Sequence, residues 1–349
     1  MVGERADADG GSTYRTFARR MLRGEPDLTT PEVAERTGLS TEVVRGFWRS
    51  LGFADVPDDV PHFTDDDVAL LRQLVELFED GTLGMAAAQS LVRAQGHSAD
   101  RLALWQVEAL VEDAVQRYAL DDTSARLLVL DRVARLAPVL EQQLVHTWRR
   151  QLVALLGRID RDVALAHAPP VPDADQLPLE RAIGFLDMIS FTERSARMSP
   201  GELAELVQGF ESAARDTIAG YGARVVKTIG DAVLYVADDL RTGAEVSLAL
   251  LDAMGTRGFE VRGSLVWGRV LSRSGDVFGP SVNLASRLGD VAPPGAVVLD
   301  DVSAALLEAR DLAVRLTPER PVAVQGLGVI RPVRLARALP DAEAVAPTR

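Results

Sequence analysis

The sequence contains no cysteine, and this absence excludes two kinds of stabilising site. Without thiols the chain forms no disulfide framework and binds no metal through thiolates, which fits a reducing compartment. Long apolar runs are also missing, since no stretch approaches the 18 consecutive apolar residues of a transmembrane helix. The polar N-terminus, MVGERADADGGSTYR, lacks the apolar core of a secretory signal. We therefore expect a cytoplasmic protein without a transmembrane segment.

Positive charge is scarce as well. The chain has 38 Lys and Arg residues against 51 Asp and Glu residues, which gives a net charge of −13 at pH 7. Such a charge repels phosphate backbones and anionic lipids, so we expect no nucleic-acid partner. With 349 residues and 47% hydrophobic residues, the chain is long and apolar enough for two domains with packed cores.

The pattern of apolar residues changes character halfway along the chain. The first half repeats them every three or four residues, which predicts helices, and Gly and Pro are expected to mark the breaks. The second half alternates short strand-like runs with helical stretches such as Pro200–Ala219 and Thr242–Met254, which predicts an α/β or α+β domain. The predicted parts are a flexible tail (1–25), a helical domain (26–166), a Pro- and Asp-rich linker (167–178), a second domain (179–340) and a second tail (341–349).

The first of three candidate functional segments surrounds Asp187. A strand is expected to run into Asp187, and a helix to begin just after Thr192, with Thr192 as its N-cap. A helix start offers unpaired backbone N–H groups, here those of Ser190, Phe191 and Thr192, to a phosphate. The neighbouring carboxylate can bind a cation that the phosphate shares.

The second segment, residues 223–236, reads as two strands joined by a tight turn at Ile229-Gly230-Asp231. This turn presents Asp231, and Lys227 lies four residues earlier. Asp187 and Asp231 would then lie on adjacent strands. Two carboxylates suit a pair of divalent cations bridged by a triphosphate better than one cation alone.

The third segment, residues 261–288, contains Asp276 between two glycines, followed by Asn283 and Arg287. A spacing of four places Asn283 and Arg287 on one face of a helix. Together they can bind a ribose and stabilise charge on a phosphate. Taken singly, each of these residues is more often a cap, a turn residue or a solvated surface charge, so only the joint pattern carries the prediction.

With these polar residues in this order and at these spacings, residues 179–338 resemble the class III nucleotidyl cyclases, in particular the homodimeric bacterial adenylate cyclases. Lys-x-x-Gly-Asp and Asp-Val-x-Gly-x-x-Val-Asn-x-Ala-x-Arg carry the resemblance, and the closing strand QGLGVIRPVRL extends it. It implies an α+β fold, a ferredoxin-like βαββαβ core with extra elements, preceded here by an all-α regulatory domain.

The resemblance also implies roles for individual residues. Asp187, Asp231 and the backbone carbonyl of Met188 would hold two Mg²⁺ or Mn²⁺ ions. Lys227 and Asp276 would select adenine, because a lysine can donate to a ring nitrogen and a carboxylate can accept from the exocyclic amine.

Two further residues complete the implied site. Asn283 would bind the ribose and Arg287 would stabilise the transition state, as ATP cyclises to 3′,5′-cyclic AMP and releases pyrophosphate. In this family the metal aspartates and the other groups come from different subunits, so the resemblance implies a two-fold homodimer with shared sites. Ser190 departs from the family, which often has glycine there, and its Cβ is expected to crowd the phosphates.

The first half contains a helix-turn-helix pattern at Thr29–Phe53, with Thr30 as the expected cap, Pro31 in the first turn, Gly38 in the turn and a second helix after Ser40. It resembles the start of MerR-type DNA-binding domains. However, residues 29–79 contain eleven Asp or Glu and four Arg, a net charge of −7, which argues against DNA binding.

The whole arrangement is similar to the actinobacterial pH-sensing adenylate cyclases, which implies regulation by pH or by a fatty acid or other small ligand. A helix over residues 125–160 would connect the two domains, and the candidate titrating groups are His62, His97, His146 and His167. Each histidine taken singly is more often a surface or hydrogen-bonded residue. Two alternative functions are a DNA-binding regulator with a degenerate cyclase fold, which predicts a basic N-terminal face that is not seen, and a catalytically silent nucleotide-binding scaffold, which the sequence leaves open.

Overall fold

A computed structural model describes residues 18–166, 179–273, 275–310, 312–324 and 326–338. The chain divides into two compact units, residues 1–168 and 169–349, here called the helical unit and the sheet unit. The predicted linker 167–178, the tail 341–349, residues 1–17 and His167 lie outside the described residues.

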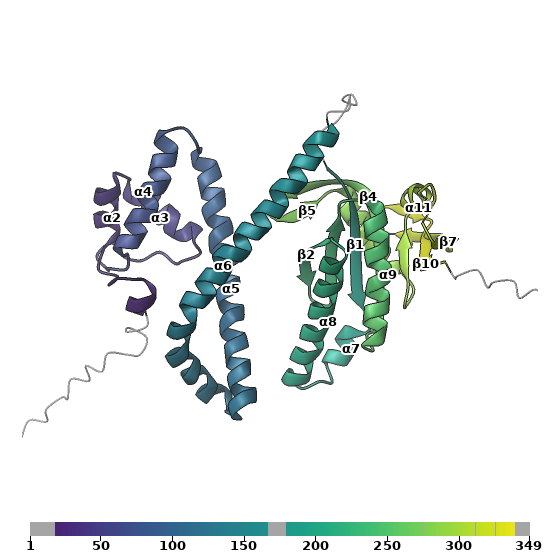
Figure 1. The fold of residues 1–349 in the computed structure, drawn as a ribbon, viewed down its shortest axis with the longest axis horizontal. Helices are drawn as coiled ribbons and strands as arrows, with labels where there is room; N and C mark the ends of the chain where they lie inside the picture. The colour runs from purple at the N-terminus through teal and green to yellow at the C-terminus, as the bar shows by residue number, and fades with distance from the viewer. Residues whose placement is uncertain (1–17, 167–178, 274, 311, 325, 339–349) are drawn as a thin grey trace, which may run out of the picture. The chain divides into compact units, whose positions relative to one another are not determined.

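The helical unit contains five named helices, drawn in purple to teal in Figure 1. Its first three helices enclose a small core around Val33, Val44 and Phe63, which are at most 1% exposed. The helices are α2 (Thr30–Thr37), α3 (Thr41–Ser50), α4 (Asp65–Glu79), α5 (Met85–Tyr118) and α6 (Asp122–Ala166).

The helix-turn-helix pattern is present, with one correction to its cap. Thr29, not Thr30, is the N-cap of α2, and the Thr29 backbone N–H donates to the Glu32 carboxylate at 2.8 Å. Gly38 ends the helix at φ 72°, a conformation that favours glycine. Helix α3 follows Ser40, as predicted, and Ser40 caps it by accepting a hydrogen bond from the Val43 N–H.

Helix α6 contains the connecting helix predicted over residues 125–160. Pro138 lies inside it. A proline removes one backbone hydrogen bond and bends a helix, and Figure 1 shows that α6 changes direction along its course. Before this bend, α6 packs on α5 through Ala125 and Val129. Among the described residues, no helix is both long and apolar enough to cross a membrane.

The sheet unit begins with a βαββαβ core. Strands β1 (Leu179–Met188), β2 (Arg224–Ile229), β3 (Ala232–Ala237) and β4 (Val261–Arg273) form an antiparallel sheet in the order β2-β3-β1-β4. Helices α8 (Pro200–Gly220) and α9 (Leu240–Thr256) connect them, close to the ranges predicted from the sequence. The α+β prediction is confirmed.

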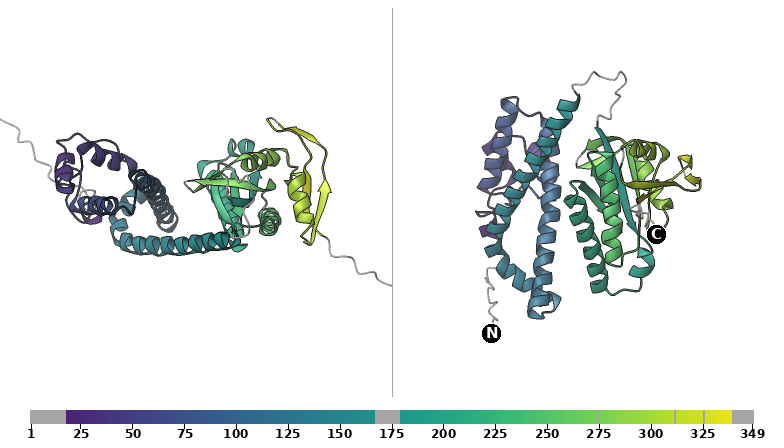
Figure 2. Two further views of the ribbon diagram at one scale, coloured as in Figure 1. Left: turned by 90° about the horizontal axis from the view of Figure 1, so that it is seen from above. Right: turned by 45° about the vertical axis from the view of Figure 1, so that its right-hand side comes forward.

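Further elements extend this core. Strand β6 (Val297–Leu299) pairs in parallel with β4 and is followed in the sheet by β10 (Val333–Arg337) and β7 (Val314–Pro318). The remaining elements are α7 (Phe191–Ser195), β5 (Asp276–Phe278), α10 (Pro280–Val291), α11 (Asp301–Glu308), β8 (Val322–Val324) and β9 (Gly328–Ile330). Figure 2 shows the sheet edge-on and face-on, with helices against it.

The two faces of the sheet have separate cores, because successive strand residues point to opposite faces. Ala182 and Leu186 of β1 pack with residues of α8 and α9. Ile183 and Phe185 pack with Ala285 and other residues of α10 on the opposite face. The same alternation places Asp187 on the α10 face.

Candidate functional site

The two candidate metal-binding aspartates lie next to each other. Asp187, near the end of β1, pairs in register with Ala232, the first residue of β3. Asp231 therefore lies beside it in the turn, and the Met188 N–H donates to the Asp231 backbone carbonyl at 3.1 Å. Gly230 precedes Asp231 at φ 62°, which confirms the predicted glycine turn.

An arginine that the sequence patterns did not reveal contacts Asp187. Arg262 faces Asp187 across the β1–β4 register, and its Nε and Nη2 both donate to Asp187 Oδ2 at 3.1 Å. Its Nη1 donates to the backbone carbonyl of Asp290 at 2.6 Å, so the guanidinium is fixed from two sides. One signal was available in the sequence, since Arg262 is the only charged residue in the otherwise apolar run VRGSLV.

The electrostatics of Asp187 favour a bound cation. Burial raises the pKa of Asp187, the hydrogen bonds from Arg262 lower it, and the charge of Asp231 raises it again, so that the pKa lies above its usual range. Two close, partly buried carboxylates thus carry more negative charge than one arginine neutralises. Oxygen ligands of this kind suit Mg²⁺ or Mn²⁺.

The donor set also limits which metal site is feasible. Among the described residues there is no group of three or more His, Asp or Glu side chains placed to hold a metal ion. Two carboxylates leave most of the coordination positions of Mg²⁺ to water, backbone carbonyls or phosphate oxygens, which is the usual arrangement for a metal that arrives with a nucleotide. The residues therefore fit metal ions shared with a triphosphate.

The segment after Asp187 differs from the prediction at one point. Helix α7 begins at Phe191, so Thr192 lies inside the helix and is not its N-cap. Ser190, just before the helix, adopts φ 57°. This left-handed conformation favours glycine, because a Cβ there crowds the following carbonyl. The unusual serine at this position is thus held in a backbone conformation that suits a glycine.

The second group of candidates joins Lys227 to Asp276. Lys227 Nζ donates to Asp276 Oδ2 at 2.5 Å, and the Val277 N–H donates to Asp276 Oδ1 at 2.8 Å. Burial alone would raise the pKa of Asp276, but these hydrogen bonds and the charges of Lys227 and Arg224 outweigh it and lower the pKa. Asp276 is therefore an ionised acceptor that is already oriented.

Lys227 is also unusual in composition. It is the only lysine in the chain, so all other basic residues except the histidines are arginines. A chain that uses arginine everywhere else retains a lysine at this one position. The sequence alone shows that Lys227 is the single lysine, but only a count of residue types reveals this, not a search for motifs.

A cavity of about 560 Å³ connects Lys227 to the start of α10. Phe185 and Phe278 contribute apolar walls, and Lys227 and Asn283 contribute polar groups. Apolar walls with a few placed polar groups are typical of a site for a small molecule.

Arg287 lies one helical turn beyond Asn283 and is exposed, with an ion pair to Asp290 at 3.6 Å between Nη1 and Oδ2. It does not line the cavity, and neither do Asp187 and Asp231. One chain thus presents two separate groups on the same face of the sheet unit: a carboxylate pair with Arg262, and a cavity with Lys227 and Asn283.

Comparison with known proteins gives a consistent result. Residues 179–335 match the family described as the adenylate and guanylate cyclase catalytic domain. A protein named adenylate cyclase from Glutamicibacter nicotianae is 38% identical over 331 residues, which cover 93% of this chain and 82% of the relative. An adenylate cyclase from Streptomyces coelicolor is 38% identical over 83% of this chain and 74% of the relative. A Mycobacterium tuberculosis protein named pH-sensitive adenylate cyclase is 30% identical over 82% of this chain and 72% of its own length.

Proposed function

The chain belongs to the class III adenylate cyclases, and we propose that it converts ATP to 3′,5′-cyclic AMP and pyrophosphate at sites shared between two copies of the chain. The observation that carries this proposal is that Asp187, whose register partner is Ala232, lies beside Asp231 in the unit that also contains the cavity lined by Lys227 and Asn283. The carboxylates would bind the metal ions that accompany the triphosphate of ATP, and the cavity would bind its nucleoside.

The carboxylate pair would hold the metal ions. Asp187, Asp231 and the backbone carbonyl of Met188 would bind two Mg²⁺ or Mn²⁺ ions. When bound, these ions neutralise the triphosphate and make the ribose 3′-hydroxyl more acidic. Arg262 supports this end of the site, because its two hydrogen bonds fix the orientation of Asp187. The backbone N–H groups of Ser190–Thr192 follow directly and would bind phosphate oxygens.

The cavity would bind the nucleoside. An ammonium has three donors, so Lys227 can keep its bond to Asp276 and still donate to a ring nitrogen of adenine. Asp276, kept ionised, would accept from the exocyclic amine. Guanine carries a carbonyl at that position and would leave the carboxylate without a donor, which disfavours GTP.

Two residues of α10 would act on the sugar and phosphate. Asn283 lines the cavity and would hydrogen-bond the ribose, which positions the 3′-hydroxyl for in-line attack. Arg287 is exposed and would stabilise the negative charge that develops on the transferred phosphate. Since the carboxylates do not line the cavity of their own chain, we assign them to the ATP bound in the cavity of a second copy.

Purified full-length protein with Mn-ATP tests the activity. We expect cyclic AMP to form, Asp231→Ala to abolish it, and the exposed carboxylate substitution Asp216→Ala on α8 to leave it unchanged. No cyclic AMP from the wild-type protein over a broad pH range would refute the proposed reaction and favour a silent nucleotide-binding scaffold.

Mixing two inactive variants tests the shared sites. Asp231→Ala removes a carboxylate and Arg287→Ala removes the transition-state group, so a mixed dimer has one intact site. Random mixing makes half of the dimers mixed, and activity should return to about a quarter of the wild-type value. If the mixture stays as inactive as each variant alone, the site is not shared between copies.

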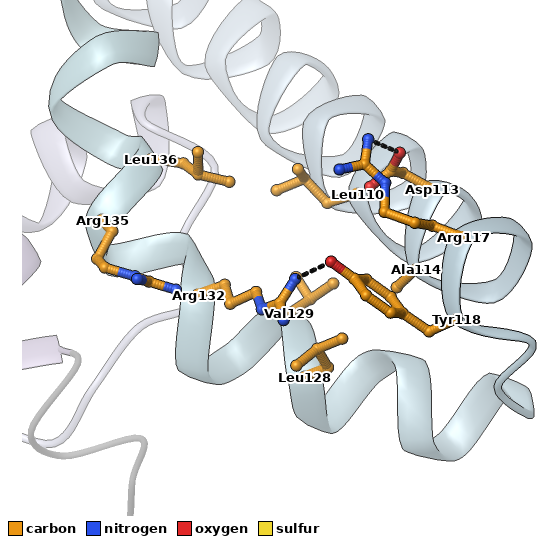
Figure 3. A pocket seen from close by; sticks show the side chains of 10 residues that line it. All are labelled: Leu110, Asp113, Ala114, Arg117, Tyr118, Leu128, Val129, Arg132, Arg135 and Leu136. Atoms are coloured by element: carbon orange, nitrogen blue, oxygen red, sulfur yellow. Dashed lines mark hydrogen bonds and ion pairs between the residues drawn. The ribbon is translucent and has the colours of Figure 1, made fainter.

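We further propose that the helical unit regulates the reaction in response to pH or to an anionic amphiphile such as a fatty acid. A cavity of about 560 Å³ between α5 and α6 supports a ligand of this class (Figure 3). Arg132 and Arg135 line it, as does Arg117 in an ion pair with Asp113 at 2.8 Å, and Leu110 and Val129 contribute apolar walls. Tyr118 accepts a hydrogen bond from Arg132 at 2.8 Å and is oriented by it.

The pH profile of cyclic AMP production tests this regulation when the full chain is compared with a variant that lacks residues 1–170. A profile that is steeper in the full chain supports regulation by the helical unit. Identical profiles would refute pH sensing by this unit, and the absence of any effect of oleate on the full chain would refute the ligand.

A further inference from the structure

Arg262 contacts two elements of the sheet unit at once. Its Nε and Nη2 donate to Asp187 Oδ2, near the end of β1, both at 3.1 Å. Its Nη1 donates to the backbone carbonyl of Asp290, near the end of α10, at 2.6 Å. A guanidinium is planar and rigid, so hydrogen bonds on both sides hold the two partners at a fixed separation. Arg262 therefore connects a candidate metal ligand to the end of a helix.

The contact with Asp290 caps α10. This helix runs from Pro280 to Val291, so the Asp290 carbonyl is one of its last four. Those carbonyls have no partner within the helix, and they form the negative end of its dipole. The last turn of α10 contains no basic residue of its own. Arg262, from β4, supplies both the missing donor and the positive charge.

Two residues of β4 anchor α10 at two points. Ser264 Oγ donates to the carbonyl of Ala285, in the middle of the helix, at 2.5 Å, and this bond is buried. Arg262 makes the second bond, five residues further along the helix. The buried side chain of Leu288 holds the helix against the sheet, but apolar packing sets its direction less strictly than a hydrogen bond does. Without Arg262, α10 would therefore pivot about Ser264, and its C-terminal end would move.

That end of α10 carries Arg287. Its Nη1 lies 3.6 Å from Asp290 Oδ2, at a spacing of three residues on one face of the helix. The two side chains are 53% and 57% exposed, so this ion pair does little to fix the arginine. The position of Arg287 thus depends on the backbone of α10, and so on the anchor that Arg262 provides.

We infer that Arg262 is a positioning residue for Arg287 as well as for Asp187. The inference rests on the proposed function, in which Asp187 and Arg287 of one chain serve two different sites. One Arg262 then holds the metal-binding aspartate of one site and the transition-state arginine of the other. A misplacement of about 1 Å can lower a reaction rate about 100-fold, so a pivot of α10 should be seen in turnover.

Amide hydrogen exchange of the full chain tests the anchor without catalysis. Arg262→Gln removes it. The matched control Arg269→Gln removes an exposed arginine of the same strand, whose Nε lies 4.0 Å from a Glu180 carboxylate oxygen. Labelling is kept short, so that α9 in the core stays protected and only local opening is measured.

We expect a peptide spanning residues 285–292 to exchange at least tenfold faster in Arg262→Gln than in the wild type, and less than twofold faster in the control. Unchanged exchange in Arg262→Gln would overturn the proposal. So would equally faster exchange in α9, because the effect would then be a general loss of stability.

Mixed dimers test the effect on Arg287 separately from the effect on Asp187. The arginine chain carries Asp231→Ala and contributes Arg287 to the working site, whereas the carboxylate chain carries Arg287→Ala and contributes the metal-binding pair. Only a mixed dimer has an intact site, and it has one. Arg262→Gln is then added to one chain or to the other, with Arg269→Gln as the control in each.

The two placements should give different results. In the arginine chain, Arg262→Gln should lower kcat at least tenfold and change the Mn²⁺ concentration for half-maximal activity less than twofold, because the carboxylates of this chain are not at the working site. In the carboxylate chain, it should raise that Mn²⁺ concentration, because Asp187 loses its orientation. The same change from both placements would indicate a merely structural role and would overturn the proposal, as would an unchanged kcat from the arginine chain.

The outcomes also separate this inference from the proposed function. Mixtures that make no cyclic AMP even with native Arg262 would refute the shared catalytic site, while hydrogen exchange still decides whether Arg262 anchors α10. Conversely, active mixed dimers that tolerate Arg262→Gln in the arginine chain would refute only the positioning of Arg287.

Discussion

Replacing Arg262 by glutamine tests how the carboxylate pair is held together. In the native chain two hydrogen bonds of 3.1 Å connect Arg262 to Asp187, whose side chain is 27% exposed. Arg262→Gln removes both bonds and the positive charge, and leaves a partly buried carboxylate beside Asp231. We expect the sheet unit to be less stable as a result.

The magnitude follows from the burial of the pair. Removing one partner of a fully buried ion pair costs about 3–5 kcal/mol, whereas exposed pairs contribute about 0–1 kcal/mol. Arg262 and Asp187 are each about 30% exposed, so an intermediate loss of about 2 kcal/mol is expected at pH 7.

The loss should depend on pH. Burial and Asp231 already hold the pKa of Asp187 above its usual range, and without the hydrogen bonds from Arg262 it rises further. A carboxyl group whose pKa is higher in the folded than in the unfolded state destabilises the fold only when it is ionised. The penalty therefore appears as pH rises through the interval between the two pKa values, and it should be smaller at pH 4.5 than at pH 7.

A double-mutant cycle with Asp187→Asn measures this coupling. Trp267 is the only tryptophan of the sheet unit and reports its urea unfolding when Trp48, Trp105 and Trp148 are replaced by phenylalanine in all variants. We expect a coupling free energy of about 1–2 kcal/mol at pH 7. Additive effects, or an equal loss at pH 4.5 and pH 7, would refute the role assigned to Arg262.

Three further predictions concern single side chains. Ser190 has a φ of 57°, so Ser190→Gly should relieve about 1–2 kcal/mol of left-handed strain in the folded state, while the greater freedom of glycine in the unfolded state costs about 0.5–1 kcal/mol. Urea unfolding should therefore show a small increase in the free energy of unfolding. A decrease would contradict the strain assigned to Ser190. Tyr235→Phe removes the buried 2.6 Å hydrogen bond to Ser247 and should cost about 1 kcal/mol in urea while cyclic AMP production persists. Lys227→Met should raise the pKa of Asp276 toward its usual value, as followed by carboxyl ¹³C NMR, because the native hydrogen bond and charge of Lys227 lower it; an unchanged titration would contradict the ion pair.

Local patterns predicted the parts of the fold that depend on near neighbours. Alternation of strands and helices predicted the α+β class, and Gly230 marked the hairpin turn correctly. Boundaries within one or two residues were less predictable: Thr29 caps α2 in place of Thr30, and α7 starts before Thr192. Two adjacent threonines offer equivalent caps, and the folded backbone selects between them.

Contacts between distant strands were beyond the sequence reading. Arg262 lies 75 residues from Asp187 and meets it only because β4 pairs with β1 in one particular register. Pro138 is a different case, because apolar spacing predicted a helix over residues 125–160 although proline disfavours helix interiors, and α6 does continue through Pro138. Tertiary pairing therefore decides the position of Arg262, which local propensity leaves undetermined.

Under the proposed function, the single lysine of the chain has a physical explanation. An arginine at position 227 would present a planar fork to Asp276 and could bind both carboxylate oxygens at once, which would fix the guanidinium plane on the carboxylate and direct its remaining donors by that plane alone. The ammonium of Lys227 contacts only Oδ2, while Oδ1 accepts from the Val277 N–H, and two of the three ammonium donors are left for a ring nitrogen. Under the proposed function, the free ammonium donors of Lys227 are what a ring nitrogen of adenine needs, which explains a lysine in a chain that otherwise uses arginine.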